Sequence, residues 1–189
     1  MSRDRSLQKY AESLFNEKRF VEAFMAYEQL AASGDPQGHA FLGWMYYEGL
    51  GVERNEKEAL RWFNTAAQLG SKVGAFYCGK YALIEQQYED AFRWLQASAK
   101  QDYGPSLLWL GLIFVRGLGR PSDLKKGVGY LRRAAGTGNF PAKRELAVLM
   151  MKGKLGWWKV PLGLVLLPYA TLVAIVEAMA GNYSEKLMG

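Results

Sequence analysis

Few residues of this 189-residue sequence have side chains suited to chemistry. Cys78 is its one cysteine and His39 its one histidine, a pair that could form a thiol nucleophile with its general base. A G-x-G formed by Gly49 and Gly51 could bring backbone amides close to a phosphate. Carboxylates for acid–base catalysis are the remaining candidates, namely Glu56, Glu58, Glu89 and Asp90. Their meaning depends on the elements that position them.

A repeat of 32 to 36 residues organises most of the chain. One column of small residues, spaced by 36, 32 and 36 positions, holds Gly43, Gly79, Gly111 and Ala147. A second small column stands five residues earlier, at Gly38, Gly74, Ser106 and Ala142. Larger residues stand one position before and three positions after the first column, so small and large residues share one helical stripe. Small side chains let two helices approach closely, and large ones fill the space at the next turn.

The second half of each unit is repeated too. The segment "EALRWFNTAAQLG" aligns with "EDAFRWLQASAKQD" and "KGVGYLRRAAGTG", and "VEAFMAYEQLAASG" is an earlier copy. The sequence therefore predicts helix pairs at about 7–34, 38–70, 74–102 and 106–138. One last helix is expected at about 142–152.

Within this repeat, the G-x-G is predicted to be a connector between two helices. Gly117-x-Gly119 stands at the same place in a later unit, and the shorter 74–102 unit lacks the motif. Glycine ends helices because it adopts left-handed backbone angles at little cost. Asn55 is the expected N-cap of the next helix, with Glu58 completing a capping box, and Ser122 or Asp123 has this role later.

The other reactive residues also have structural explanations. Cys78 shares a column with Leu42 and Leu110, which predicts a core position, and His39 lies one unit away. The carboxylates fall at helix starts, where the helix dipole favours them. One histidine and one cysteine do not make a usual zinc site. We expect no catalytic residue, no metal and no cofactor.

These motifs resemble the SEL-one-like repeat family, a branch of the tetratricopeptide-type α-solenoids. The segments "HAFLGWMYYEGLGVERNEKEALRWFNTAAQLG" and "SLLWLGLIFVRGLGRPSDLKKGVGYLRRAAGTG" follow its pattern, and residues 74–102 are closer to a plain tetratricopeptide repeat. The resemblance covers about residues 20–153. It implies an all-α fold, a right-handed α-solenoid of antiparallel helix pairs. It also implies an adaptor or scaffold without an active site, as in many bacterial envelope and signalling systems.

A second stripe on the first helices is the candidate partner-binding surface. It consists of Phe41, Trp44, Tyr77, Lys80, Trp109 and Leu112. The first helices of a solenoid usually line its concave face, where exposed aromatic side chains could anchor a partner protein. Packing between repeats is the alternative, and the sequence leaves it open.

The positive charge is unevenly distributed. The net charge is +6, and residues 131–159 hold seven basic residues against one acid, Glu145. This basic region directly precedes the most hydrophobic part of the chain. An anionic lipid surface explains that placement more simply than nucleic acid, for which no recognisable motif is present. A basic nucleic-acid scaffold is the weakest of the alternatives.

The segment from Val160 to Ala180 contains a single charged residue, Glu177. As a helix it would be about 30 Å long, close to the hydrocarbon thickness of a bilayer. The candidate membrane-interface residues are Lys152, Lys154, Trp157, Trp158 and Lys159. Pro168 would kink a helix, so a re-entrant helical hairpin stays open, as does a buried capping or dimerising helix.

The sequence is divided into a repeat domain, 1–153, and a hydrophobic C-terminal segment with a short polar tail, 154–189. Our first hypothesis is a non-enzymatic adaptor for an unknown protein partner, tethered through residues 157–180 to the cytoplasmic face of a bacterial inner membrane. By family analogy it would serve an envelope or polysaccharide-synthesis assembly. The alternative is a soluble cytoplasmic adaptor whose C-terminal segment dimerises or docks on a partner.

Overall fold

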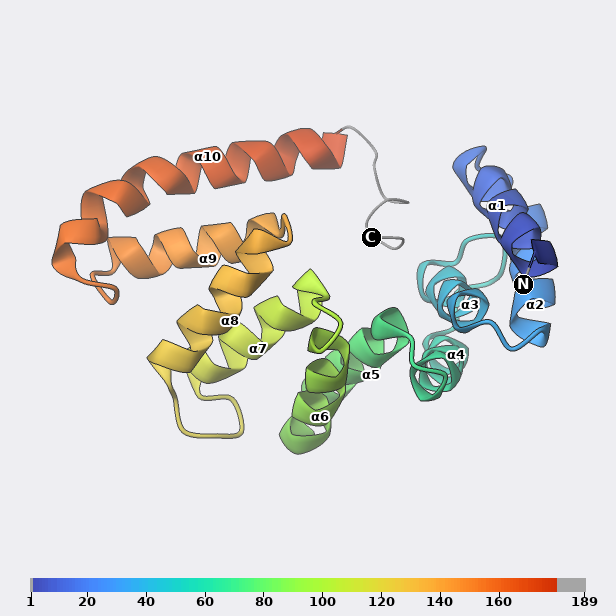
Figure 1. Ribbon diagram of the computed structural model, residues 1–189, viewed down its shortest axis with the longest axis horizontal. Helices are drawn as coiled ribbons and strands as arrows, with labels where there is room; N and C mark the ends of the chain where they lie inside the picture. The colour runs from blue at the N-terminus through green and yellow to red at the C-terminus, as the bar shows by residue number, and fades with distance from the viewer. Residues whose placement is uncertain (1, 180–189) are drawn as a thin grey trace. The chain divides into compact units, whose positions relative to one another are not determined.

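The computed structural model describes the backbone of residues 2–179 and the side chains of 5–156 and 158–172. In that part of the chain all regular structure is helical, and no strand occurs (Figure 1). The expected all-α fold is confirmed. The helices are α1 (Ser2–Asn16), α2 (Phe20–Ala32), α3 (Pro36–Glu48), α4 (Glu56–Gln68), α5 (Lys72–Ile84), α6 (Tyr88–Ala99), α7 (Gly104–Arg116), α8 (Leu124–Gly136), α9 (Phe140–Met151), the short 3-10 helix η1 (Trp157–Lys159) and α10 (Val160–Met179).

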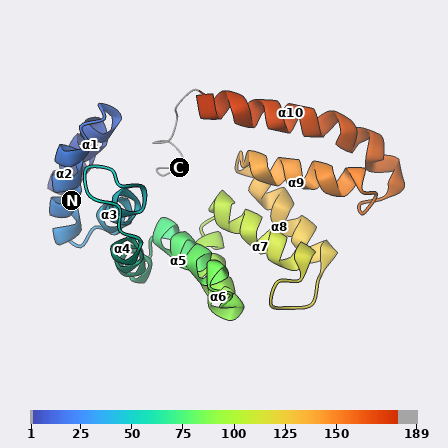
Figure 2. The ribbon, with the colours of Figure 1, turned by 180° about the vertical axis from the view of Figure 1, so that it is seen from behind.

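The chain forms two compact units, Met1–Ser98 and Ala99–Gly189. In the first unit α1 packs on α2, α2 on α3, α3 on α4 and α4 on α5, and α3 also contacts α5. In the second unit α7 packs on α8, α8 on α9 and α9 on α10, and α9 and α10 lie side by side in both views (Figures 1 and 2). Packing between neighbours in the sequence is the mark of an α-solenoid.

The helices begin where polar side chains cap their free backbone amides. The Asn55 Oδ1 accepts hydrogen bonds from the backbone N–H groups of Lys57 and Glu58, both at 3.1 Å. The Asp123 carboxylate accepts one from Lys126 N at 2.9 Å, which also lowers the pKa of Asp123. These two predicted N-caps are confirmed. The expected capping box is incomplete, because the backbone N–H of Asn55 donates to the carbonyl of Tyr46 at 2.9 Å and the Glu58 carboxylate accepts from Arg61.

The G-x-G segments are helix ends, as predicted. Gly49 has φ 74° and its N–H donates to the carbonyl of Met45 at 2.8 Å. Gly117 has φ 71° and donates in the same way to Ile113 at 2.9 Å. Left-handed angles of this kind favour glycine at the end of a helix. The two motifs are connectors, and no strand of the Rossmann type precedes them in the described chain.

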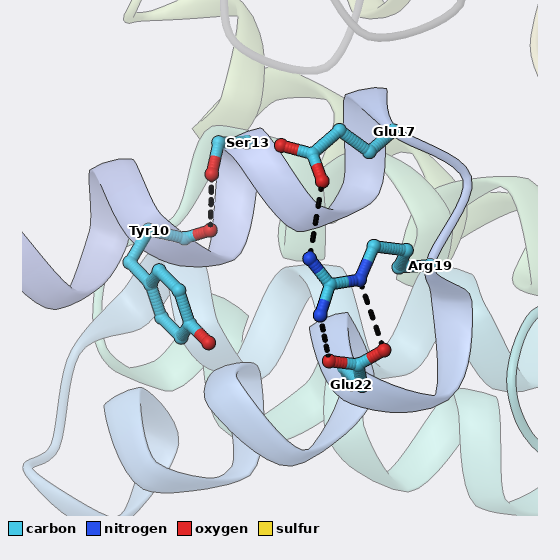
Figure 3. Close-up of polar contacts among 5 residues, drawn as sticks. All are labelled: Tyr10, Ser13, Glu17, Arg19 and Glu22. Carbon is cyan, nitrogen blue, oxygen red and sulfur yellow. Dashed lines mark hydrogen bonds and ion pairs between the residues drawn. The ribbon is translucent and has the colours of Figure 1, made fainter.

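The turn between α1 and α2 is held by a small ionic network (Figure 3). The Arg19 Nε donates to Glu22 at 2.9 Å and its Nη1 donates to Glu17 at 3.2 Å. The hydrogen bond from Arg19 keeps the pKa of Glu22 below its ordinary value. Because all three side chains are about half exposed, the network orients the turn but adds little stability.

The core lies along the two columns of small residues. A Cβ atom at Gly43 would lie 2.7 Å from the ring of Phe63, and one at Gly79 would lie 2.7 Å from the side chain of Leu95. Both facing side chains are fully buried. The close approach of the two helices in each pair is therefore confirmed as the reason for the small column.

Candidate protein-interaction site

The structure divides the predicted partner-binding stripe into two groups. Phe41, Trp44 and Leu112 are buried. Tyr77, Lys80 and Trp109 are partly exposed. A partner can therefore contact the side chains of the second group directly, whereas those of the first lie within the protein.

Stacked rings explain why the stripe is largely internal. The ring of Phe41 stacks on that of Tyr27 with centroids 4.4 Å apart and planes 6° from parallel. Tyr77 stacks on Phe63 in the same way, at 4.1 Å and 6°. The two pairs are 36 residues apart at both members, so they are one contact repeated. It joins the second helix of one unit to the first helix of the next, as the packing alternative proposed.

Two of the partly exposed residues, Tyr77 and Lys80, lie beside Tyr47. The Lys80 Nζ donates to the Tyr47 hydroxyl at 3.0 Å and lies 4.8 Å from the centre of the Tyr47 ring. It is also 5.6 Å from the centre of the Tyr77 ring. The Arg54 guanidinium lies 5.9 Å from the centre of the Tyr47 ring. The Tyr81 ring meets the Tyr47 ring edge-on, with the two ring centres 6.3 Å apart. We call Tyr47, Arg54, Tyr77, Lys80 and Tyr81 the Tyr47 cluster.

Sequence reasoning missed three members of this cluster, Tyr47, Arg54 and Tyr81. A signal was present for two of them. Tyr47 stands three residues after Trp44, and Tyr81 stands four after Tyr77, so both continue the stripe at helical spacing. Arg54 lies in the connector after the G-x-G, where no periodicity points to a helix face.

The Tyr47 cluster is suited to binding rather than to proton transfer. Burial raises the pKa of Tyr81 to about 12, so its hydroxyl stays protonated at neutral pH. Lys80 supplies positive charge beside the rings of Tyr47 and Tyr77, whereas Arg54, also beside Tyr47, is already paired with Glu56. Such an arrangement attracts carboxylates and lets aromatic side chains stack.

The contacts of Cys78 and His39, the two candidates for nucleophile and base, indicate structural roles. Burial raises the pKa of the Cys78 thiol to about 12, so the thiol is neutral and a poor nucleophile near pH 7. His39 Nδ1 lies 2.9 Å from the backbone oxygen of Asp35, and its ring lies 5.5 Å from that of Trp62. Among the described residues, no group of three or more His, Cys, Asp or Glu side chains is placed to hold a metal ion.

The candidate membrane-interface residues lie between α9 and α10, from the C-cap of α9 at Lys152 to η1. Lys152, Lys154 and Trp158 are exposed and Lys159 is partly exposed. The side chain of Trp157 and residues 180–189 lie outside the described part of the chain. The hairpin alternative is not observed, because Val160–Met179 form one helix with Pro168 inside it. None of the helices searched, all within the described residues, combines the length and apolar character needed to cross a membrane.

Helix pairs with glycine connectors and repeated close contacts define a Sel1-like repeat fold. The sequence signature of the Sel1 repeat matches residues 36–71, 72–103 and 104–139, which together exceed half of the chain. The protein belongs to the Sel1 repeat family. Proteins with these repeats act as scaffolds for protein interaction and are typically not catalytic.

Known relatives support the repeat but are much longer. A putative sel1-like repeat-containing protein of Acanthamoeba polyphaga mimivirus is 28% identical over 67% of this chain and 24% of its own length. The Arabidopsis thaliana protein described as the ERAD-associated E3 ubiquitin-protein ligase component HRD3B is 28% identical over 55% of this chain and 17% of its own. The chain thus spans a quarter or less of these two relatives.

A solved structure shows the same fold. The crystal structure of a Sel1 repeat protein from Oxalobacter formigenes aligns with a TM-score of 0.70 at 24% identity. The alignment covers 79% of this chain and 61% of the other. The likeness establishes a shared arrangement of helices in the repeat region.

Proposed function

We propose that this protein is a non-enzymatic scaffold that binds a partner protein through the Tyr47 cluster. The observation that carries the proposal is a partly exposed group of aromatic and cationic side chains on the first helices of a Sel1 repeat stack. Solenoids bind partners along surfaces formed by neighbouring repeats. Here α3 and α5, which contact each other, supply the surface together.

The buried members of the stripe have a supporting role in this proposal. Phe41 and Trp44 lie on α3 and pack against the preceding helix pair, where the ring of Trp44 lies 5.2 Å from that of Phe15 on α1. Trp109 is a partly exposed candidate in the second unit, with Leu112 buried beside it on α7. Within the stripe of the first unit, direct contact with a partner is therefore assigned to Tyr77 and Lys80, and rigidity to the buried Phe41 and Trp44.

The chemistry of the cluster defines the kind of partner segment that fits. Lys80 favours a carboxylate, and the partly exposed Tyr47 and Tyr77 favour an aromatic or aliphatic side chain next to it. We therefore propose a short acidic segment that carries at least one large apolar residue. Relatives such as HRD3B, named as a component of a ligase complex, support a role within an assembly.

The location of the scaffold forms a separate part of the proposal. We place it on the cytoplasmic face of a bacterial inner membrane, at an envelope assembly, with 1–153 as the repeat domain and 154–189 as the attached segment. Support comes from exposed Lys152 and Lys154 and from exposed Trp158 at the start of α10. A soluble cytoplasmic adaptor that docks or dimerises through α10 is the second candidate, favoured by the packing of one face of α10 on α9.

Site-specific crosslinking tests the binding surface. A photoreactive residue at Tyr47 should trap a partner that the same residue at Lys57, exposed on α4, does not. With the trapped protein purified, Lys80→Glu should weaken its binding by about tenfold, since a charge-assisted contact becomes a repulsion. Lys57→Glu, the matched charge reversal, should bind as the wild type. Equal affinity of the two variants would refute the Tyr47 cluster as the binding surface.

A further inference from the structure

The last helix repeats the packing of α8 at a distance of 36 residues. A Cβ atom at Gly127 of α8 would lie 2.9 Å from the carbonyl oxygen of Gly111 on α7. A Cβ atom at Gly163 of α10 would lie 2.7 Å from the carbonyl oxygen of Ala147 on α9. Both members of the second contact are 36 positions after those of the first. The two helices of each pair therefore meet in the same register.

A second column confirms this register. Ala66 of α4, Ala134 of α8 and Ala170 of α10 occupy equivalent positions, and all three are buried. In the same way Ala59 is buried at the position equivalent to Gly163. By its contacts, α10 is the second helix of a fifth helix pair, α9 and α10, although its composition hides the repeat.

The face of α10 opposite to these contacts differs from its counterpart in α4. In α4 the equivalent face is polar and exposed, with Arg61, Thr65 and Gln68. In α10 the same three positions are apolar and 69%, 62% and 61% exposed; they are Val165, Tyr169 and Leu172. Leu162, one turn earlier, is also exposed. We call Leu162, Val165, Tyr169 and Leu172 the outer face of α10.

Another repeat stacked on α10 would not cover this outer face. The fold itself supplies the comparison, since α5 packs on α4 and yet Arg61, Thr65 and Gln68 stay exposed. Stacking uses the neighbouring face, where Gly74 of α5 meets Ala66 and Ala67 of α4. An occupant of the outer face would therefore be something other than the next unit of a solenoid.

Charge indicates which occupant fits. Residues 99–172, the part of the second unit that ends with the last described side chain, hold twelve Lys and Arg against three Asp and Glu. No charged residue occurs between Val160 and Leu172, and exposed Lys152 and Lys154 precede them. Two copies joined through α10 would bring like charges together, which opposes a dimer. An anionic surface would be attracted, and an apolar helix face flanked by lysines is typical of binding at a lipid interface.

We propose that the outer face of α10 docks in the plane of an anionic lipid bilayer, with Lys152, Lys154 and Lys159 at the level of the lipid phosphates. This inference deepens the proposed membrane attachment and rests on it. The inner face of α10 stays packed on α9, so the fifth helix pair joins the bilayer to the repeat stack.

Vesicle flotation of the full chain tests the proposal. Vesicles of equal parts phosphatidylglycerol and phosphatidylcholine are compared with vesicles of phosphatidylcholine alone. The outer-face variant is Val165→Gln, Tyr169→Thr and Leu172→Gln. Its matched control is Tyr10→Thr, Val21→Gln and Met25→Gln. These three apolar side chains of the first unit are 55%, 56% and 55% exposed, and the control likewise replaces them with polar ones. Circular dichroism verifies that every variant is folded.

The wild type and the control should float with the anionic vesicles, and less so at high salt. The outer-face variant should bind about tenfold more weakly or worse, because three apolar side chains no longer enter the interface. Undiminished flotation of that variant would overturn the inference while leaving membrane attachment standing. A wild type that never floats would overturn both the docking of α10 and the membrane attachment. If that wild type is a dimer and the outer-face variant is a monomer, the occupant of the outer face is a second copy of the chain. Binding at the Tyr47 cluster is measured separately and is independent of either result.

Discussion

At Gly74 the absence of one side chain sets the distance between two helices. A Cβ atom there would lie 2.6 Å from the backbone nitrogen of Ala67 and 2.6 Å from the carbonyl oxygen of Phe63. Backbone atoms cannot rotate aside as a side chain can. We therefore expect Gly74→Ala to lower the free energy of unfolding by about 2 kcal/mol. Urea unfolding followed by circular dichroism measures this change.

Gly129 provides the control for that substitution. It lies on α8, is exposed, and has open space around the position that a Cβ atom would take, with no neighbour within 4 Å. Since alanine is the better helix former, Gly129→Ala should raise the free energy of unfolding by about 0.5 to 1 kcal/mol. A gain in stability for Gly74→Ala as well would mean that α4 and α5 separate without cost.

The structural role of a residue could be predicted from the sequence where the same residue type recurs at one position of the repeat. The small column around Gly43 and the core position of Cys78 follow from spacing alone, and the structure buries both. Exposure of the aromatic stripe was not predictable. Phe41 is buried because Tyr27 of the preceding pair stacks on it, and a single column does not reveal which neighbour covers it.

At the scale of one element, the start of α4 depends on Asn55. Its side chain accepts hydrogen bonds from two backbone N–H groups that the helix leaves free. Asn55→Ala should lower the free energy of unfolding by about 1 kcal/mol, as expected for loss of an N-cap. Thermal or urea unfolding of the full chain measures it.

Asn64→Ala on the same helix is the matched control. Asn64 is exposed within α4, away from the cap. Because alanine favours a helix interior, this change should be neutral or stabilising by a few tenths of a kcal/mol, roughly. If both asparagines had the same effect, the cap would contribute nothing specific.

The fate of each element shows what local sequence can predict. Helices α1 to α8 were predicted as pairs because a helical stripe recurs in each unit, with glycine ends and caps in the units at 38–70 and 106–138. The pairing of α10 with α9 was not recognised. Its outer residues are apolar, so the polar side of the repeat pattern is missing, and only the positions of Gly163 and Ala170 retain the register.

For the whole molecule, packing between sequence neighbours predicts local rather than global opening. In the Gly74→Ala variant, hydrogen exchange should accelerate in α4 and α5, which meet at the altered site. Helices α8 and α9 should keep their wild-type protection. Exchange measured by mass spectrometry on the intact chain distinguishes the two regions. Uniform loss of protection in all helices would instead show one cooperative unit.

The sequence by itself determined the helix pairs, their glycine connectors and their N-caps. These features depend on interactions within a few residues and on a period that recurs along the chain. Only the tertiary structure decided that Phe41 and Trp44 are covered, that Lys80 bridges Tyr47 and Tyr77, and that α10 presents an apolar face away from α9. The physical reason is that burial of a side chain depends on which residues one repeat away pack against it.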